Sequence, residues 1–421
     1  MDREMGMTFM CNQQKVLVLN AGSSSIKYRL YLMPSSRIMA QGSVERIHEE
    51  ASIVRHKEFV DGMSESHEER CSVSDHKDAL HRIMNLLGNP DLGVLHDLKE
   101  IGAVGHRVVH GGERFTGSIL VDDQVIKTIE AHAILAPLHN PANLAGIKAA
   151  WEVLPHALQV AAFDTAFHHT LPEYAYRYAL PEELYRQHGL RRYGFHGTSH
   201  RYVARRALKC LGSNREKTNL ITAHLGNGCS MTAIREGHSV DTSMGFTPLE
   251  GLVMGTRCGD LDPAIPLFLI NQLGMTAEEV DHILNKNSGL LALSGHSNDM
   301  REILQGEARC DARCKLALEI FTYRIKKYIG SYKAVLGQVH ALIFTGGIGE
   351  HSSQVRAMIC EGLDAIGMVL DDRLNRVESQ SERDVSHKDS PTRIWVIPTD
   401  EESRIAVDTH EITMKWRRIE G

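Results

Sequence analysis

Two arginines on glycine-rich segments are candidates for binding an anion. Arg107 stands in GHRVVHGG, after a short apolar run, and Arg257 stands in GTRCGDLDP. A planar guanidinium binds a carboxylate or a phosphate through two parallel hydrogen bonds, and glycines let a ligand approach the backbone. The pattern predicts that the two side chains hold one anionic ligand from opposite sides. For Arg107 alone, a surface ion pair with Glu113 is the alternative.

Asp164 and His196 occupy positions where polar groups meet ligands. Asp164 ends the apolar run VAAFD. A buried carboxylate there needs an arginine, a metal or backbone donors, and ligands of open α/β sheets bind beyond strand carboxyl ends. His196 lies just before a helix predicted over 200–211 and capped by Thr198 or Ser199, a place that favours anions. Its neighbour Phe195 lines a site or packs in the core.

The strands that position such groups begin with Lys15–Leu32, KVLVLNAGSSSIKYRLYL, which predicts a hairpin. Its small-residue turn, Gly22 to Ser25, could cradle phosphate oxygens. Asn20 would offer Mg²⁺ a neutral oxygen ligand, and Lys27 would offer phosphates a point charge. The alternative is a serine-rich surface hairpin. The alternation places Ile26, Tyr28, Leu30 and Leu32 on one face, and Lys27, Arg29 and Tyr31 on the other.

Leu220–Ile234, LITAHLGNGCSMTAI, repeats the strand, turn and strand plan. This weak internal duplication predicts two related lobes that hold a polyphosphate between them. A third glycine-rich turn, Gly346–Gly349, lies between a strand and a helix capped by Ser352 or Ser353. Backbone N–H groups and the helix dipole bind nucleotides at such turns, although the spacing is not the dinucleotide pattern GxGxxG.

Composition limits the class of protein. The chain has 421 residues, which predicts two domains, and 42% hydrophobic with 24% charged residues is typical of globular proteins. A net charge of −6 with mixed signs indicates no nucleic acid and no anionic membrane as partner. No apolar run is long enough to span a bilayer. The 8 cysteines stand singly, which favours reduced thiols in a cytoplasmic protein.

The expected fold class is α/β with two lobes. We predict a disordered leader over 1–14, a first lobe over 15–165 that is joined by a C-terminal helix over 398–421, and a second lobe over 166–397. In the first lobe, a third strand is expected at Gly42–Ile47, followed by exposed structure up to Cys71. In the last helix, Glu401 or Glu402 would ligate Mg²⁺ or complement the helix dipole. Leu138, between prolines, lines a small apolar pocket or packs in the core.

Eight motifs in order resemble the acetate kinase family of short-chain carboxylate kinases, over nearly the whole chain. They are NAGSSSIK, GHRVVHGG, FDTAFH, YGFHGTSH, HLGNG, GFTPLEGLVMGTRCGDLDP, FTGGIGEHS and PTDEE. The resemblance implies two RNase H-like lobes of the actin, Hsp70 and sugar-kinase superfamily around a nucleotide cleft. It also implies ATP and ADP, acetate and acetyl phosphate, Mg²⁺ with Mn²⁺ as an alternative, and a homodimer joined through the second lobe.

The resemblance also implies roles for individual residues. Asn20 and Glu401 are the magnesium-linked positions. Asp164 is the catalytic acid position, while His196 and Arg257 stabilise the transition state. Arg107 is the substrate position, and the residues around the methyl group of acetate are Val109, Leu138, Phe195 and Pro248.

The nucleotide positions implied by the resemblance come from four segments. Two residues depart from common family patterns, since Gly346 stands where alanine is common and His351 where asparagine is common. The positions are Lys27, His224, Leu225, Gly226, Asn227, Gly228, Asp299, Met300, Arg301, Gly347, Ile348, Gly349, Glu350 and His351.

The chemistry of acetate predicts the mechanism. Acetate is an anion at neutral pH, because carboxyl pKa values lie near about 4, so it needs no general base. It needs charge screening to approach the γ-phosphate for direct in-line transfer, and we expect Asp164 to orient a partner instead of abstracting a proton. The branched Val109 favours acetate over propionate, although one methylene is worth only about 1–3 kcal/mol. The alternatives are a propionate kinase and, more remotely, an ATP-hydrolysing switch like actin or Hsp70.

Overall fold

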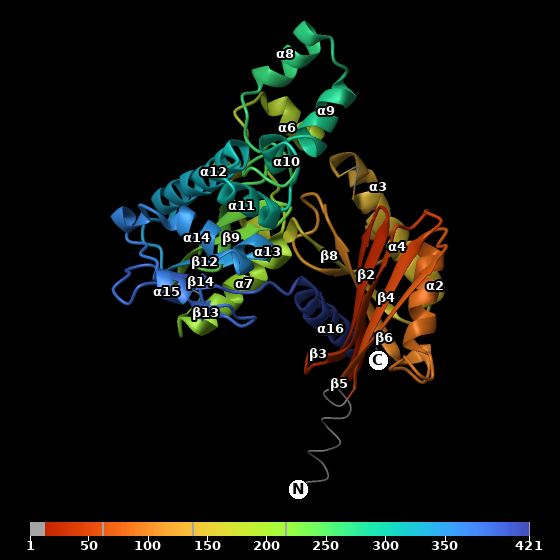
Figure 1. Ribbon diagram of the computed structural model, residues 1–421. Coiled ribbons are helices and arrows are strands. Elements are labelled where there is room, and N and C mark those ends of the chain that lie inside the picture. The colour runs from red at the N-terminus through yellow and green to blue at the C-terminus, as the bar shows by residue number, and fades with distance from the viewer. Residues whose placement is uncertain (1–12, 61–62, 137–138, 215–216, 421) are drawn as a thin grey trace. The chain divides into compact units, whose positions relative to one another are not determined.

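The computed structural model describes residues 13–60, 63–136, 139–214 and 217–420 (Figure 1). The chain divides into two compact units. Unit 1 is Met1–Ala166 with Asp400–Gly421, and unit 2 is Phe167–Thr399. Most of the predicted leader lies outside the described residues, and the first strand begins at Gln14. None of the described helices is long and apolar enough to cross a bilayer.

Unit 1 contains an eight-stranded mixed sheet with the strand order β5-β4-β3-β2-β1-β6-β8-β7. The predicted hairpin is confirmed, because β1 pairs antiparallel with β2, and β1, β6 and β8 then run parallel. The strands are β1 (Gln14–Gly22), β2 (Ser25–Met33), β3 (Arg37–Glu45), β4 (Ser52–Val60), β5 (Met63–Cys71), β6 (Ile101–Val108), β7 (Ile119–Leu120) and β8 (Leu158–Phe163). The helices are α2 (His76–Leu87), α3 (Asp123–Ala131), α4 (Asn140–Val153) and α16 (Glu401–Glu420), with short 3₁₀ turns η1 (Leu98–Glu100) and η2 (His132–Leu135).

Helices cover both faces of this sheet. In Figure 1, α16 lies on one side of the sheet, and α2 and α4 lie on the other. Tyr31 is buried in the cluster that includes Ile405 and Ala406 of α16. The prediction that Tyr31 lies on the face opposite Ile26, Tyr28 and Leu30 is confirmed, and its face is buried there as well. A C-terminal helix, distant in sequence, turns that side of β2 into a second core.

The expectation of exposed structure after the third strand is wrong for β4, whose inward face is buried, and right for β5, which has no buried residue; both strands extend the sheet. The inward face of β4 carries Val54, His56 and Glu58, all buried. His56 is satisfied by the Tyr28 hydroxyl at 2.5 Å and by the Leu92 carbonyl at 2.8 Å. Polar residues on the inward face hid the alternation that normally indicates a strand.

Unit 2 repeats the topology of unit 1, which confirms the predicted duplication. Its sheet has the order β11-β10-β9-β12-β14-β13. The run β11-β10-β9-β12-β14 has the same antiparallel and parallel neighbours as β3-β2-β1-β6-β8. The strands are β9 (Asn219–Leu225), β10 (Cys229–Arg235), β11 (His238–Thr242), β12 (Ala341–Thr345), β13 (Arg383–Asp384) and β14 (Arg393–Val396).

The helices of unit 2 include two that begin differently from the prediction. α7 begins at Gly197, so Thr198 and Ser199 lie inside its first turn and do not cap it. The glycine-rich segment after β12 is itself helical, as α13, and Ser352 caps the next helix as predicted. The helices are α5 (Glu173–Tyr176), α6 (Glu182–His188), α7 (Gly197–Cys210), α8 (Ala264–Leu273), α9 (Ala277–Lys286), α10 (Gly289–Ser294), α11 (Met300–Ala308), α12 (Ala312–Leu336), α13 (Gly346–His351), α14 (Ser353–Cys360) and α15 (Asp372–Asn375), with 3₁₀ turns η3 (Ala166–Thr170) and η5 (Leu363–Ile366).

Candidate active site

A polar cluster lies at the carboxyl ends of three strands of unit 1. Asn20 is near the end of β1, Arg107 is near the end of β6, and Asp164 directly follows β8. Because these strands are parallel neighbours, their carboxyl ends meet at one edge of the sheet. Glu401, the first residue of α16, joins the cluster. The structure therefore brings together four of the residues that the sequence marked for chemistry.

Arg107 is the centre of this cluster. Its Nη2 lies 2.5 Å from Asp164 Oδ2, its Nε lies 3.3 Å from Asp164 Oδ1, and its Nη1 lies 3.4 Å from Asn20 Oδ1. Its Nε also lies 3.7 Å from Glu401 Oε2. Asp164 is 1% exposed, whereas Arg107 is 22% exposed. The alternative pair with Glu113 is wrong, and Arg107 instead contacts two carboxylates.

The charges of the cluster act on one another. Burial alone would lower the pKa of Arg107, but the Asp164 and Glu401 carboxylates outweigh burial and raise it. Burial raises the pKa of Glu401 to about 7, and the nearby Asp164 charge adds to this while Arg107 opposes it. The guanidinium is therefore a fixed positive charge. The Glu401 carboxyl is poised to respond to a cation.

The other unit 1 candidates surround this cluster. Val109 is buried, and its N–H donates to Asn143 Oδ1 at 3.0 Å, while Asn143 Nδ2 donates to the Ala21 carbonyl at 2.7 Å. These bonds join the ends of β1 and β6 to α4. Lys27 is exposed and is the cross-strand partner of Asn20. Leu138 lies outside the described residues, so its predicted place stays a prediction.

Unit 2 contains a cluster of histidines around Ser230. The Ser230 hydroxyl lies 2.8 Å from His196 Nδ1 and 2.8 Å from His200 Nε2. The His196 ring stacks on His224, with a centroid separation of 4.4 Å. His196 itself has φ 54° and ψ 24°, an uncommon left-handed conformation for a residue with a side chain. Ser230 thus holds His196 at the start of α7.

A second chain of hydrogen bonds holds His224. Its Nδ1 lies 2.8 Å from the Ser199 hydroxyl, which lies 2.8 Å from the Thr399 hydroxyl. The backbone N–H of Thr399 donates to Glu350 Oε1 at 3.0 Å, as does the N–H of Gly346 at 2.8 Å. Ser199 therefore serves this network instead of capping α7. Glu350 is used here to hold backbone groups.

Arg257 differs from Arg107 in its partners. It is half-buried, and its Nη1 contacts only weak acceptors, the Pro248 carbonyl at 3.4 Å and the Met254 sulfur at 3.8 Å. Within the described part of the chain, no carboxylate forms an ion pair with it. Burial lowers its pKa from the ordinary value. A Cβ at Gly228 would lie 3.3 Å from the His196 ring and 3.7 Å from Arg257 Nη1, so glycine lets both side chains approach the β9-β10 turn.

A pocket of about 730 Å³ opens beside that turn, entirely within unit 2. Asn227 and Asn298 meet there, with Asn298 Nδ2 donating to Asn227 Oδ1 at 2.9 Å. Asp299 caps α11 and pairs with the exposed Arg301 at 2.5 Å. The pocket is lined by Gly226, Asn227, Asn298, Asp299, Met300, Arg301, Leu304, Gly347, Ile348, His351, Ser352, Ser353 and Gln354.

The predicted nucleotide residues lie mostly together, whereas the predicted methyl-group residues do not. Eight predicted nucleotide positions outside the His224–Gly228 turn and Lys27 come from α13 and from the start of α11 with its N-cap Asp299, and of these Gly349 and Glu350 do not line the pocket. The predicted methyl-group residues are divided, because Val109 lies in unit 1 while the buried Phe195 and Pro248 lie in unit 2. Some residues that position others, and part of the pocket wall, were not expected from the sequence. They are Ser199, His200, Ser230, Asn298, Leu304, Ser352, Ser353 and Gln354.

Comparison with known proteins identifies the family. Residues 15–407 match the model of the acetokinase family. The chain is 52% identical to the acetate kinase of Methanosarcina thermophila over 398 residues, which cover 94% of this chain and 97% of that protein. It is also 52% identical to the acetate kinase of Thermotoga maritima over 406 residues, 96% of this chain and 100% of that protein.

Solved structures agree with this assignment. The crystal structure of Porphyromonas gingivalis acetate kinase matches with a TM-score of 0.89 and 45% identity, over 95% of this chain and 100% of that one. A propionate kinase from Francisella tularensis matches with a TM-score of 0.87 and 43% identity, over the same shares of the two chains. These matches confirm the predicted α/β fold class. The chain belongs to the acetokinase family.

Proposed function

We propose that this chain is an acetate kinase, which transfers a phosphoryl group reversibly and directly between ATP and acetate, giving acetyl phosphate and ADP. The observation that carries the proposal is the Arg107 guanidinium, held by the buried Asp164 at the strand ends of a chain that belongs to the acetokinase family. Such a positive charge recognises a small carboxylate. The enzyme is a phosphotransferase with a carboxyl group as acceptor.

Arg107 supplies the acceptor site in this proposal. Its Nη1 is the nitrogen not committed to Asp164, since its only polar contact in the described structure is Asn20 Oδ1 at 3.4 Å. Acetate would bind there as an anion without losing a proton. We assign the methyl group to Val109, Leu138, Phe195 and Pro248. Asp164 positions the guanidinium, and no step requires it to accept a proton.

The nucleotide occupies the unit 2 pocket in this proposal. The backbone of the Gly226–Gly228 turn and the start of α13 offer N–H groups to phosphates. The α11 residues Asp299 and Arg301 and the α13 residues Gly347 and Ile348 surround the nucleoside. We assign Lys27 of unit 1 to the phosphates. Its exposed side chain has the length and charge for that role.

Mg²⁺ fits the oxygen donors of Asn20 and Glu401. Both are hard oxygen ligands, and Mg²⁺ typically takes one or two protein ligands and completes its shell with water and substrate phosphates. Burial and the neighbouring carboxylate of Asp164 raise the pKa of Glu401, and a bound cation would oppose both effects. When bound, the ion would neutralise phosphate charge during transfer; Mn²⁺ would serve in the same way.

His196 and Arg257 act on the phosphoryl group in transit. Arg257 is a half-buried cation with no carboxylate partner in the described structure, so its charge is available to an anion. Ser230 fixes the ring of His196 through Nδ1, which orients the imidazole for this role. Both groups would stabilise charge that increases in the transition state.

Turnover of acetate, propionate and butyrate with ATP tests the proposal, with hydroxylamine added to trap the acyl phosphate as a hydroxamate. We expect acetyl hydroxamate to form fastest. Hydrolysis of ATP without any hydroxamate would instead support an ATP-hydrolysing switch. Faster turnover of propionate would reassign the chain to the propionate kinases, a possibility kept by the 43% identity to one of them.

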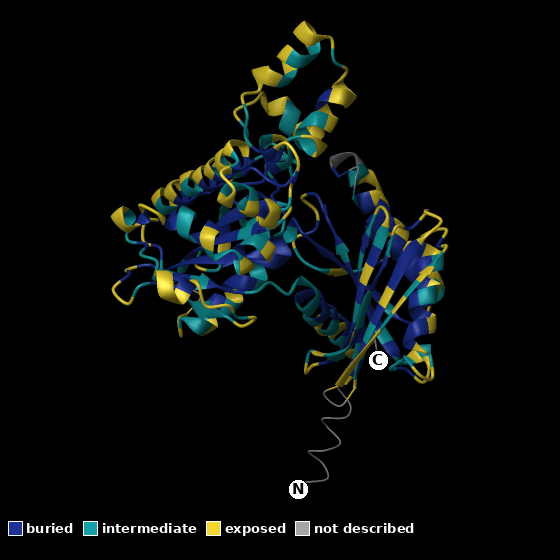
Figure 2. Cartoon of the chain, in the orientation of Figure 1, coloured by how far each residue is buried: buried dark blue, intermediate teal, exposed yellow. Residues whose placement is uncertain are grey.

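We further propose a homodimer joined through unit 2, in the cytoplasm. Helix α8 carries no buried residue and exposes Ile265, Leu267, Phe268 and Leu273, which are 45%, 60%, 56% and 61% exposed (Figure 2). An apolar patch of this kind marks an interface. The described cysteines, Cys71 to Cys360, are all free thiols, which favours a reducing compartment. Sedimentation of the chain and of Phe268→Glu tests the dimer; a wild-type monomer would contradict it.

A further inference from the structure

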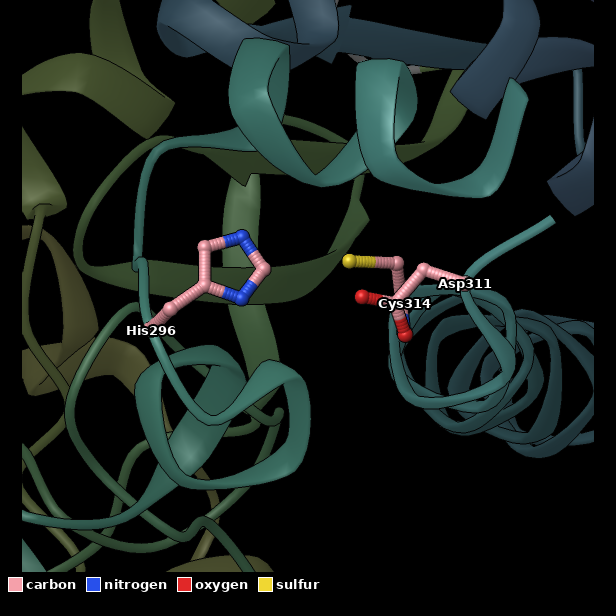
Figure 3. Close-up of side chains that lie close together, drawn as sticks. All are labelled: His296, Asp311 and Cys314. Carbon is pink, nitrogen blue, oxygen red and sulfur yellow. The ribbon is translucent and has the colours of Figure 1, made fainter. Parts of the chain in front are cut away.

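Three side chains of types that commonly bind metal ions meet in unit 2, and the proposed reaction uses none of them. His296, Asp311 and Cys314 each place one ligand atom within 4.8 Å of the others. In Figure 3, His296 comes from the loop after α10, while Asp311 and Cys314 come from the first turn of α12, and the imidazole and thiol point toward one another. Nitrogen, oxygen and sulfur donors thus converge from two separate segments.

The two segments are already fastened to each other. Arg313, between the two α12 ligands, donates from Nη2 to the Ala292 carbonyl at 2.8 Å and from Nε to the Leu293 carbonyl at 3.2 Å. It therefore caps the carboxyl end of α10. Gly295 has φ +85°, and a Cβ there would lie 2.3 Å from the Arg313 guanidinium. This close fit places the next residue, His296, opposite the start of α12.

The two α12 ligands are positioned by the helix itself. Asp311 is the N-cap, and its Oδ1 accepts from the N–H of Arg313 at 2.8 Å and of Cys314 at 3.2 Å. Capping uses Oδ1, so Oδ2 can serve a ligand. Cys314 is fully buried, and its Sγ lies where a Cβ at Gly306 of α11 would meet it at 2.4 Å. Glycine at that position leaves room for the sulfur.

The tautomer of His296 suits metal binding. Its Nδ1 lies 3.3 Å from the Ser294 carbonyl, so an Nδ1–H would donate there and leave Nε2 as the ligand. Metal-binding histidines commonly use such a second hydrogen bond to fix the ring. The imidazole and Asp311 are exposed, whereas the sulfur is buried. An ion would therefore enter from the solvent side.

The nitrogen, oxygen and sulfur donor atoms of this cluster determine which metal ion fits. Thiolate and imidazole disfavour Mg²⁺ and Ca²⁺ and suit Zn²⁺, which takes sulfur at about 2.3 Å and nitrogen at about 2.0 Å. We propose that His296, Asp311 and Cys314 bind one Zn²⁺ or a chemically similar ion, with water as the fourth ligand. Binding displaces the Cys314 thiol proton to solvent, as thiolate ligation requires. The ion joins the loop after α10 to the start of α12.

A metal ion bound here would also affect the neighbouring pocket of unit 2. The loop that carries His296 continues to Asn298 and Asp299, which line the pocket of unit 2. Helix α11, which follows, contacts Cys314 at Gly306. A bound ion would therefore restrain both ends of the segment that forms one wall of the pocket. Because only the folded chain brings the ligands together, the ion also stabilises it.

Metal binding to the full chain tests the proposal directly. The protein is stripped with a chelator and dialysed against Zn²⁺ in the presence of excess Mg²⁺, and bound zinc is measured per chain. We expect one Zn²⁺. Co²⁺ then serves as a spectroscopic probe, and a thiolate-to-cobalt charge-transfer band is expected. His296→Gln and Cys314→Ser should weaken the affinity about 100-fold or more, since even loss of a supporting contact costs about 10–100-fold.

Matched variants separate this site from adventitious binding. Cys310→Ser changes an exposed thiol of the same turn, and His282→Gln changes an exposed histidine of α9; neither should alter the affinity. Zn²⁺ should raise the melting temperature of the wild type but not of His296→Gln, whose exposed position keeps the fold intact. The proposal is overturned if Cys314→Ser binds zinc as tightly as the wild type, if the cobalt complex lacks the thiolate band, or if Cys310→Ser abolishes binding.

Discussion

The Arg107 guanidinium and the Asp164 carboxylate form a two-point ion pair, with Nη2 to Oδ2 at 2.5 Å and Nε to Oδ1 at 3.3 Å. Asp164 is almost completely buried, so its charge depends on Arg107 for compensation. The pair fixes the direction of the guanidinium and leaves Nη1 for another ligand. This relationship makes separate predictions for the two residues.

Arg107→Ala should raise the KM for acetate at least about tenfold, because the charge that recognises the carboxylate is lost. The KM for ATP should change much less. Steady-state kinetics with each substrate varied in turn measures both. Arg55→Ala, which removes a surface arginine paired with Glu45 and Glu68, is the control. An unchanged KM for acetate in the Arg107 variant would sink the assignment.

Asp164→Asn should lower kcat by about 10²-fold or more, because a neutral amide no longer holds the guanidinium in a charge-assisted pair. A positioning role predicts that the remaining rate keeps the pH profile of the wild type. Comparing kcat from pH 6 to 9 in both proteins checks this. Near-full activity would exclude an essential role, and loss of one limb of the profile would instead indicate proton transfer by Asp164.

Arg257→Ala should lower kcat by about 10³-fold, with smaller changes in both KM values, because its charge acts on the transition state. Arg257→Lys keeps the charge but not the planar fork, and it should recover only part of the rate. Single-turnover measurements isolate the transfer step. Equal losses in kcat and in ATP affinity would assign Arg257 to ground-state binding.

Ser230→Ala should reduce kcat about tenfold while leaving both KM values nearly unchanged. The hydroxyl lies 2.8 Å from both His196 and His200, so its removal takes away the hydrogen-bond partner of His196 Nδ1. Ser331→Ala, which changes an exposed serine of α12, serves as the comparison. If Ser230→Cys or Ser230→Thr restored no activity and the melting temperature fell sharply, the residue would be needed for the fold and not for positioning His196.

Stability should fall as the pH decreases from about 6.5 to about 4. Burial lowers the pKa of His106 to about 4 and of His168 to about 4. These rings are neutral when folded, while the unfolded chain takes up protons below its ordinary pKa of about 6.5. Their contribution to the free energy of unfolding is therefore complete above that pH, and it is lost as the pH falls to their pKa in the folded state. Each shift is worth on the order of 3 kcal/mol at most.

Urea unfolding at pH 7.5 and pH 5 measures this effect. His106→Gln should lose less stability than the wild type between the two pH values, because one titrating group is gone. His282→Gln, which changes an exposed ring, should behave as the wild type does. A wild-type stability that is equal at both pH values would contradict the prediction.

Much of the site could be predicted because it lies at the ends of apolar strands. The runs before Asn20, Arg107 and Asp164 predicted three strands, and Asp164 was expected at a strand end, where ligands bind. The structure adds that the three strands are parallel neighbours, so these residues meet at one edge. The duplicated hairpin similarly predicted the matching sheet of unit 2. Where the pattern was weak, prediction failed: the inward His56 and Glu58 concealed β4, and polar β5 has no buried residue.

The supporting residues could not be predicted, because their roles depend on neighbours distant in sequence. Ser199 was expected to cap α7, yet its hydroxyl binds His224 and Thr399. Tyr31 was correctly placed on the face opposite Leu30, but only the structure shows that α16 covers that face. No local pattern predicts which distant segment will cover a strand, or which distant residue will form a hydrogen bond with a hydroxyl group.

The amino-acid sequence by itself determined the family, the α/β class, the repeated hairpin and the polar residues that carry the chemistry, since periodicity and motifs are local properties. Only the tertiary structure decided how those residues are charged and held. Arg107 and Arg257 look alike in sequence, but packing gives Arg107 two carboxylates and gives Arg257 none in the described structure. Electrostatics depends on distance in space, which the fold sets and local sequence does not.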